Sequence, residues 1–464
     1  MKRYQLPALI ALSVLLSLLI SGCEETYTKE VDEDQKISDS RGQFSGDLDD
    51  NDQFGAALAN IGDLEGDGVI DLAVGAPNDD DNGENRGAVW VLFLDDDGQV
   101  DTQQKISDSK GSFDGDLDDG DQFGTAIAPL DDLNGDGFRD IVVSAPMDDD
   151  GGTDHGALWV LFLKDDGTVE SYQKISEESG GLNENLDADD QFGHAVANIG
   201  DLNNDGITDL AVGMPNDDDG GTDRGAVWIL FMNSDGTVSE RQKISSEKGN
   251  LERKPNDGDR FGSSVSAIGD LDDDGVVDIA VGTSGDDDGG TDRGAVWVLF
   301  LNSDGTVDGL KRISHNRGGL EDQLSNGDRF GSALANLGDL NDDGNDDLVV
   351  GAPGSDDGGS NRGAVWILFM QGDGEIISAS QISDTEGDFD GSLNDNDQFG
   401  SSLASIGDLN GDDHQDLAVG APFDDNGGTD KGAVWILFLG ATESHYDTSE
   451  GIIFGSLSSA IQQQ

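Results

Sequence analysis

The sequence repeats itself every 69 residues, and six copies follow one another in register. Each copy opens with a Phe-Gly pair and contains one of the six tryptophans of the chain. Self-similarity of this kind is typical of architectures in which one small structural unit is stacked or arranged in a ring. The markers are Phe54, Phe123, Phe192, Phe261, Phe330 and Phe399, and Trp90, Trp159, Trp228, Trp297, Trp366 and Trp435.

The first copy predicts four β-strands and no helix. Small residues over 54–61 predict an innermost strand, and Asp71–Ala76 predicts a second one that Pro77 ends, because proline cannot donate to a ladder. The continuous apolar run Gly87–Leu94 is typical of a strand covered on both faces. The shorter, more polar segment Gln104–Ser107 fits an outer edge strand. Four strands per copy predict an all-β fold, a β-propeller of six four-stranded blades.

The two ends of the repeated region complement each other. The fourth-strand motif occurs once more at Gln35–Ser38, without the three strands that would precede it, whereas the sixth copy has no clear fourth strand after Leu439. We therefore expect the N-terminal strand to complete the last blade, with a propeller over residues 35–440 and a C-terminal tail or degenerate strand over 441–464. Alternatively, Ile452–Ile461 supplies this strand or belongs to a seven-bladed ring.

An acidic loop of fixed layout separates the first two strands of every copy. Acidic or amide side chains occupy positions 1, 3, 5 and 9 of the pattern, and glycine occupies position 6 in five copies. Oxygens at 1, 3 and 5 converge on one side of a tight turn, position 7 adds its carbonyl, and position 9 closes the shell. This arrangement suits calcium better than magnesium. The alternative is an ordinary acidic turn, but carboxylates about 4 Å apart repel by roughly 1 to 4 kcal/mol without a cation.

The pattern predicts about one Ca²⁺ per copy, up to six in the chain, with the sixth loop the weakest because Asp413 replaces the glycine. The candidate side-chain ligands are Asp63, Glu65, Asp67 and Asp71; Asp132, Asn134, Asp136 and Asp140; Asp201, Asn203, Asp205 and Asp209; Asp270, Asp272, Asp274 and Asp278; Asp339, Asn341, Asp343 and Asp347; and Asp408, Asn410, Asp412 and Asp416. The candidate carbonyl ligands belong to Val69, Phe138, Ile207, Val276, Asn345 and His414.

The Phe-Gly opening, the acidic loop and the Val-Gly-Ala-Pro77 ending together resemble FG-GAP repeats, the units of the integrin α-subunit propeller. The resemblance extends over about residues 35–439. It implies calcium between the first and second strands of each blade and ligand recognition on the opposite face. The chain departs from integrins in having six repeats rather than seven and longer units, and nothing in it resembles an inserted domain or a transmembrane helix.

Residues 1–22 have the pattern of a secretory signal, in which Lys2 and Arg3 precede an apolar stretch and small residues lead to Cys23. Ile20-Ser-Gly-Cys23 resembles the lipobox of bacterial lipoproteins, which implies lipidation of Cys23. The alternative is an ordinary cleaved signal with an incidental cysteine. Residues 23–34 are expected to form a polar tether. These features predict an exported lipoprotein of the outer membrane or cell surface, or alternatively one that faces the periplasm.

Charge excludes several kinds of partner. The chain has 98 aspartates and glutamates against 25 lysines and arginines, a formal net charge of −73. Such a surface repels nucleic acid and anionic lipid headgroups, so we expect no nucleic-acid partner and membrane contact through the lipid anchor only. Cys23 is the only cysteine, so no disulfide within the chain stabilises the fold.

Other repeated residues have structural interpretations. The tryptophans lie inside apolar runs, which favours packing between blades over stacking on sugars, and the Phe-Gly phenylalanines are expected in the inner core. Basic residues recur directly before the third strand, where we expect them to pair with the acidic loops. They are Arg86, Arg224, Arg293, Arg362 and Lys431, with His155 in the second copy.

No catalytic constellation emerges from the sequence. The five histidines occupy five different repeat positions, and neither H-E-x-x-H nor G-x-S-x-G is present. We therefore expect a protein that is not an enzyme and has no catalytic residues, a calcium-dependent binding or adhesion module for an extracellular protein or glycan ligand. The alternatives are a propeller-based polysaccharide hydrolase or lyase, and a structural surface-layer component.

Overall fold

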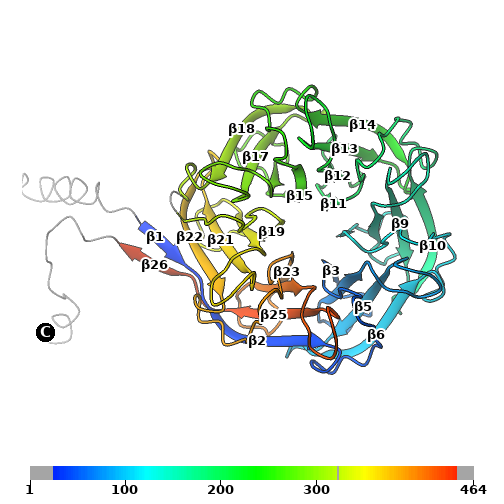
Figure 1. The fold of residues 1–464 in the computed structure, drawn as a ribbon, viewed down its shortest axis with the longest axis horizontal. Coiled ribbons are helices and arrows are strands. Elements are labelled where there is room, and N and C mark those ends of the chain that lie inside the picture. The colour runs from blue at the N-terminus through cyan, green and yellow to red at the C-terminus, as the bar shows by residue number, and fades with distance from the viewer. Residues whose placement is uncertain (1–24, 321–322, 447–464) are drawn as a thin grey trace, which may run out of the picture.

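A computed structural model of the protein describes residues 25–320 and 323–446. Six four-stranded antiparallel sheets surround a central axis as the blades of a propeller (Figure 1). The prediction of an all-β propeller with six four-stranded blades is confirmed. Within the described residues, no helix is long and apolar enough to cross a membrane.

The four strands of each blade follow one another in chain order. The first blade contains β3 (Ala57–Gly62), β4 (Asp71–Ala76), β5 (Ala88–Leu94) and β6 (Val100–Ser107). The next four blades contain β7 (Ile127–Pro129), β8 (Ile141–Ala145), β9 (Ala157–Leu163) and β10 (Val169–Ile175); β11 (Ala195–Asn198), β12 (Leu210–Met214), β13 (Ala226–Met232) and β14 (Val238–Ser245); β15 (Phe261–Ala267), β16 (Ile279–Thr283), β17 (Ala295–Leu301) and β18 (Val307–Ser314); and β19 (Ala333–Gly338), β20 (Asp347–Ala352), β21 (Ala364–Met370) and β22 (Ile376–Ser383).

The sixth blade is assembled from both ends of the repeated region. Three of its strands are β23 (Ser402–Gly407), β24 (Asp416–Ala421) and β25 (Ala433–Leu439), and the fourth is β2 (Val31–Ser38) from the N-terminal side. Strand β2 lies antiparallel to β25 with Lys36 opposite Trp435, the same register that places Lys105 opposite Trp90 in the first blade. The predicted closure by the N-terminal strand is therefore what the structure shows.

The segment expected to be a polar tether is folded as strand. Residues 25–28 form β1 (Glu25–Thr28), which pairs with β26 (Glu443–Tyr446) in a two-stranded sheet beside the ring (Figure 1). Backbone N–H groups of Tyr27 and Lys29 donate to the hydroxyls of Ser378 and Ser380 at 2.8 and 3.0 Å. Strand β2 occupies the place for which Ile452–Ile461 was the alternative, and that segment lies outside the described residues.

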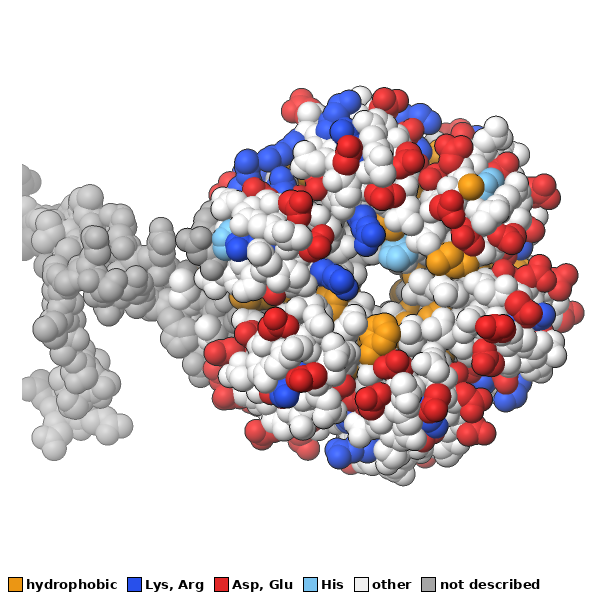
Figure 2. All heavy atoms as spheres, in the orientation of Figure 1, with side chains coloured by type: hydrophobic (Ala, Val, Ile, Leu, Met, Phe, Trp, Pro, Cys, Tyr) orange, Lys and Arg blue, Asp and Glu red, His pale blue; other side chains and the backbone are white. Residues whose placement is uncertain are grey.

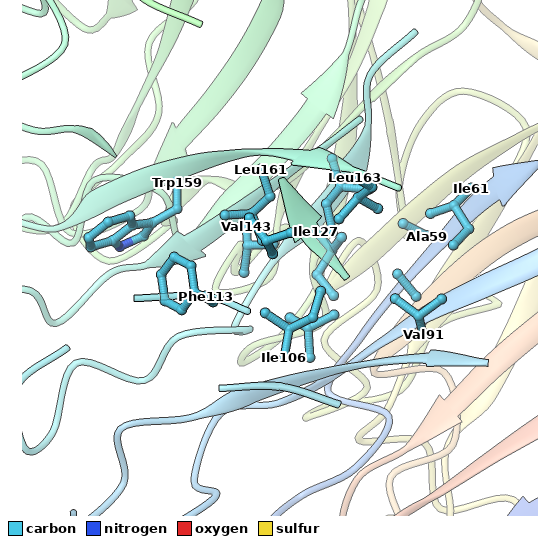
Figure 3. Packing of buried hydrophobic residues seen from close by; sticks show 14 of the residues in the cluster. Ala59, Ile61, Val91, Ile106, Phe113, Ile127, Val143, Trp159, Leu161 and Leu163 are labelled. Atoms are coloured by element: carbon cyan, nitrogen blue, oxygen red, sulfur yellow. The ribbon is translucent and has the colours of Figure 1, made fainter. Parts of the chain in front are cut away.

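The hydrophobic core lies between neighbouring blades. Every residue of β5 is buried, because blades cover the third strand on both faces. Figure 3 shows one such core, in which Ala59 and Ile61 of the first blade lie toward Leu163 of the second, and Phe113 packs against Trp159 at the other end. All six tryptophans are at most 6 % exposed, and all six Phe-Gly phenylalanines are fully buried, so their predicted core positions are confirmed.

Glycines permit the close approach of one blade to the next. Gly87 precedes β5 with φ 87°, and it forms a parallel bridge with Phe123 of the following blade. A Cβ at Gly87 would lie 2.0 Å from the carbonyl oxygen of Phe123, so a larger residue would separate the blades. The contact recurs as Phe54 with Gly432, which carries it across the junction between the first and last blades.

Candidate functional site

The acidic loops all lie between the first and second strands of their blades, and each backbone is folded around its first aspartate. In the first blade, Asp63 accepts hydrogen bonds from the backbone N–H groups of Gly66, Asp67 and Gly68 at 2.7 to 2.9 Å. Asp67 in turn accepts the N–H of Val69 at 2.8 Å. Because both residues recur at the same place in every loop, the sequence pattern fixes the local conformation of all six.

The ninth residue of each loop is buried at the start of the second strand. Asp140 is fully buried, and its two oxygens accept the N–H groups of Leu133 at 3.0 Å and Leu163 at 3.2 Å. Burial raises the pKa of Asp140 to about 7, although these hydrogen bonds favour the charged form. Burial raises the pKa of the equivalent Asp71 to about 7 as well. Each loop therefore holds a carboxylate whose charge is costly without a nearby cation.

The donor set fits a hard cation. Within the described residues none of the candidate carboxylates belongs to an ion pair, and Oδ1 of Asp71 is buried without a hydrogen-bond partner. In the fourth loop, oxygens of Asp270, Asp272 and Asp278 lie within 4.8 Å of one another. This is the only group of three acidic, histidine or cysteine ligands that close in the described part of the chain. Four of the other loops have asparagine at position 3, whose amide donates to position 5 in the second loop at 2.8 Å.

The sixth loop lacks the usual glycine and has a buried lysine beside it, whereas the cation that shares a cavity with Asp63 and Glu65 of the first loop is the exposed Arg139. Asp413 adopts the left-handed conformation with φ 70°, as Gly68 does with φ 99° in the first loop, so the backbone path is kept without glycine. The buried Lys29 lines a cavity with Asp413 and His414, beside this loop. Burial lowers the pKa of Lys29, and the charges of Asp412 and Asp416 oppose that effect. A protein cation therefore lies in the field of the sixth loop.

On the opposite face, a buried ion pair holds the loop between the second and third strands. The ammonium of Lys105, from the outer strand β6, contacts Asp79 at 2.5 Å and Asp81 at 2.8 Å and lies 5.2 Å from the ring centroid of Trp90. The arrangement recurs in four other blades. The equivalent cations are Lys36, Lys174, Lys243 and Arg312, which pair with Asp424, Asp148, Asp217 and Asp286.

The fifth blade replaces both members of this pair together. Ser355 stands where the other blades have the buried aspartate, and Gln381 stands where they have the cation. Gln381 donates instead to Asp357 of the same loop. The paired replacement indicates that neither charge is tolerated alone in this position. Sequence reasoning missed the pair, although the repeated lysine of Gln-Lys-Ile-Ser was visible at the 69-residue spacing.

The uncharged pair of the fifth blade suggests a direct test at the equivalent ion pair of the first blade. Lys105→Gln should destabilise the protein by about 3 kcal/mol or more, because removing one partner leaves Asp79 charged and buried. Burial already raises the pKa of Asp79, and Lys105 counteracts it. The double variant Asp79→Ser with Lys105→Gln should recover most of the loss. Urea denaturation measures both, with the exposed Lys110→Gln as the control; equal losses in the single and double variants would contradict this interpretation.

The basic residues before the third strands pair with acidic loops, as predicted, in four of the five cases. Arg86 contacts Asp108 at 3.1 Å and Asp119 at 2.9 Å. Arg293 is the exception, since its Nε donates to the amide oxygen of Asn326 at 2.9 Å. The remaining pairs are Arg224 with Asp257, Arg362 with Asp384 and Asp395, and Lys431 with Asp39, while His155 contacts Glu177.

The innermost strands surround an axial channel with two cavities. One, of about 260 Å³, is lined by Asn60, Asn198 and Asn336 from alternate blades. The other, of about 120 Å³, is lined by His194 and by small residues at the beginning of the inner strands. Figure 2 shows basic and histidine side chains beside the central opening, on a face whose periphery is largely acidic. Sequence reasoning did not anticipate this basic group.

Comparison with known proteins agrees with this architecture. The model of the FG-GAP repeat matches residues 54–92, 123–161, 192–230, 261–299, 330–368 and 399–437, which together make up half of the chain. The chain belongs to the FG-GAP repeat family. Each matched segment runs from the Phe-Gly pair through the acidic loop into the third strand of a blade.

Integrin α subunits are among the relatives of this FG-GAP protein. It is 34 % identical to integrin alpha-PS5 of Drosophila melanogaster over 36 % of this chain and 15 % of that one. It is 35 % identical to integrin alpha-6 of Gallus gallus over 35 % of this chain and 14 % of that one. With integrin alpha-PS2 of Drosophila melanogaster the identity is 32 % over 53 % of this chain and 16 % of that one. The chain thus spans less than a fifth of these relatives.

A solved structure is also similar at low level. The crystal structure of BBS1N in complex with ARL6DN, soaked with lead, is 11 % identical, with a TM-score of 0.41 over 89 % of this chain and 97 % of that chain. This similarity is too low to bear on the function of the FG-GAP propeller.

Proposed function

We propose that this FG-GAP protein is a calcium-binding module that captures an extracellular protein or glycan ligand and is held at the cell surface by lipidated Cys23. Calcium would be held by the loops between the first and second strands, one ion per blade. Ligand would bind on the opposite face, where the loops that follow the second strands project from a rigid ring. Membership of a family that includes integrin α subunits supports a binding role.

The convergence of Asp270, Asp272 and Asp278, whose oxygens lie within 4.8 Å of one another, is the observation that carries the calcium assignment. Three carboxylates so close repel one another, and a cation held by positions 1, 3, 5 and 9 would offset that repulsion. When bound, calcium supplies positive charge to the first loop, whose carboxylates form no ion pair with any residue that the structure describes. The protein's own contribution is the folded loop, in which Asp63 fixes the backbone and Asp71 joins the site to β4.

Capture measurements test the proposal. Purified mature protein is applied to arrays of extracellular proteins and glycans, in calcium and in excess chelator. We expect ligands that are retained in calcium and released by the chelator, because loss of the ions loosens the blades that present the ligand-binding loops. A parallel array in magnesium separates a specific calcium requirement from a general need for divalent charge. If no ligand depends on calcium, the proposed function is wrong.

Anchoring through Cys23 is a separate prediction, since this residue lies outside the described part of the chain. The parent protein should fractionate with membranes, because acyl chains partition into the bilayer. Cys23→Ser should be released into the soluble fraction or remain unprocessed. Cell fractionation with detection of the folded propeller measures both. A parent protein that is fully soluble would exclude lipid anchoring while leaving the binding role open.

A further inference from the structure

One residue from each blade surrounds the mouth of the channel on the face opposite the calcium loops. This residue directly precedes the phenylalanine of the Phe-Gly pair. It has the same left-handed backbone in all six blades, with φ between 54° and 59°. Four blades have glutamine here and two neighbouring blades have arginine. The ring is Gln53, Gln122, Gln191, Arg260, Arg329 and Gln398.

The two arginines lack the carboxylate partners that Arg86, Arg224 and Arg362 have on this face. Arg86, at the periphery, is held by two aspartates. The guanidinium groups of Arg260 and Arg329 make no hydrogen bond or ion pair with any described residue, although the chain contains 98 acidic residues. Their backbone N–H groups donate to Asp223 and Asp292, so the main chain of both residues is fixed. Unpaired charge at a rigid position points to an absent partner.

A neutral hydrogen-bonding group, His194, lies near Arg260. His194, from the third blade, lines the cavity of about 120 Å³ at this mouth. Burial, together with the positive charge of the nearby Arg260, lowers the pKa of His194 to about 4, so the imidazole is neutral at pH 7 and offers one N–H. The hydroxyl of Ser263 in the same cavity accepts the N–H of Ser284 at 3.0 Å, and its own proton remains free to be donated. His194 and Ser263 therefore line a cavity that has no acidic residue in its lining, Arg260 lies near it, and Arg329 occupies the equivalent position in the next blade.

We propose that the channel mouth, through Arg260, Arg329 and His194, is a binding site for a carboxylate group of the ligand. The planar fork of a guanidinium matches the two oxygens of a carboxylate, and charge-assisted hydrogen bonds of this kind are among the strongest. A cavity of about 120 Å³ has room for such a group, since a water molecule takes about 30 Å³ in the liquid.

The rest of the ligand should be basic. The net charge of −73 and the acidic periphery of this face repel a ligand that is anionic throughout (Figure 2). A basic peptide segment that presents one carboxylate would satisfy both regions, with its cations over the periphery and its carboxylate in the mouth. This inference rests on the proposed function in one respect, that the ligand binds on this face.

Two labelled peptides that differ in one group test the assignment. One is a fluorescein-labelled lysine–glycine peptide with a free C-terminal carboxylate, and the other is the same peptide amidated. Fluorescence anisotropy with the mature protein in calcium should show roughly tenfold or tighter binding of the free acid, because a hydrogen bond between charged groups contributes about 1.5 to 3 kcal/mol. Attraction to the acidic periphery should be similar for both peptides.

The double variant Arg260→Gln with Arg329→Gln should bind both peptides equally. It should fold normally, because glutamine stands in this position with the same φ in four blades. The matched control, Lys110→Gln with Lys248→Gln, removes the same charge from exposed turns and should keep the preference.

A parent protein that binds the two peptides equally, or not at all, would overturn the inference, as would a preference that survives in the arginine double variant. If the parent protein prefers the free acid but no ligand on the arrays depends on calcium, the carboxylate site at the mouth is supported and the proposed function is wrong.

Discussion

Removal of calcium is expected to lower the melting temperature of the protein by about ten degrees or more. Each acidic loop holds a buried carboxylate such as Asp140, together with three more acidic or amide side chains. Without the ion these groups repel one another, and no disulfide within the chain restrains the ring. Calorimetry of the mature protein in calcium and in excess chelator measures the difference.

The size of the effect follows from the number of sites. A ligand that binds only the folded state stabilises it by about 2.7 kcal/mol at a concentration 100 times its dissociation constant. Six such sites give an upper bound of roughly 16 kcal/mol, comparable with the whole stability of many domains. For a chain of this length, 1 kcal/mol corresponds to roughly 1 °C in melting temperature. Binding of calcium to the acidic unfolded chain reduces the figure.

Single substitutions should show how much of the calcium-dependent rise in melting temperature each loop contributes. Asp205→Ala, in the third loop, should reproduce a fraction of the loss. Asp412→Ala should cost less, because Lys29 already places a positive charge beside the sixth loop and Asp413 replaces the usual glycine. A melting curve that is indifferent to calcium would show that these loops are ordinary acidic turns.

Deletion of residues 30–40 should open the ring at the sixth blade. It removes β2, whose pairing with β25 runs from Val31 opposite Leu439 to Ser38 opposite Ala433. It also removes Lys36, which leaves Asp424 buried and without its cation. We expect rapid hydrogen exchange in β23 to β25 and a large loss of stability, while the first to fifth blades keep slower exchange. Exchange mass spectrometry resolves the blades.

Deletion of residues 447–464 is the matched control, because described strands already supply all four strands of every blade and β2 is the fourth strand of the sixth. It should leave the exchange of the sixth blade unchanged. Destabilisation of that blade by the C-terminal deletion alone would mean that the ring is closed by the segment around Ile452 and not by β2.

The repeat made most of the fold predictable. Asp71–Ala76 was predicted as a strand and is β4, and the Gln-Lys-Ile-Ser motif correctly placed the N-terminal strand in the last blade. The Phe-Gly pair was less accurately placed. Only Phe261 lies within a strand, whereas Phe54 forms a single bridge to the previous blade before β3 begins at Ala57. The phenylalanine joins blades, a role that local sequence does not reveal.

Contacts between residues that are far apart in sequence were also not predictable. Lys105 and Asp79 are separated by 26 residues and are brought together only when the outer strand folds back over the loop. Residues 25–28 have no apolar pattern, and they form a strand because β26 and β22 lie beside them. His194, Arg260 and Arg329 come from three copies and lie at the same end of the channel only because the inner strands converge on one axis. The sequence of any single copy does not contain such a group, so the repeat pattern alone cannot predict it.

Closure by β2 also sets the order of events when the chain folds. The strands of the first five blades are neighbours in sequence, whereas the Lys36–Asp424 contact of the sixth blade spans 388 residues. The entropy of closing so long a segment exceeds that of closing about 50 residues by roughly 2 kcal/mol, and contacts this distant in sequence form slowly. Until they form, β25 is an unpaired edge, open to strands of other molecules. Although the six blades are nearly equivalent, the β2–β25 pairing of the sixth blade thus forms last during folding and opens first during unfolding.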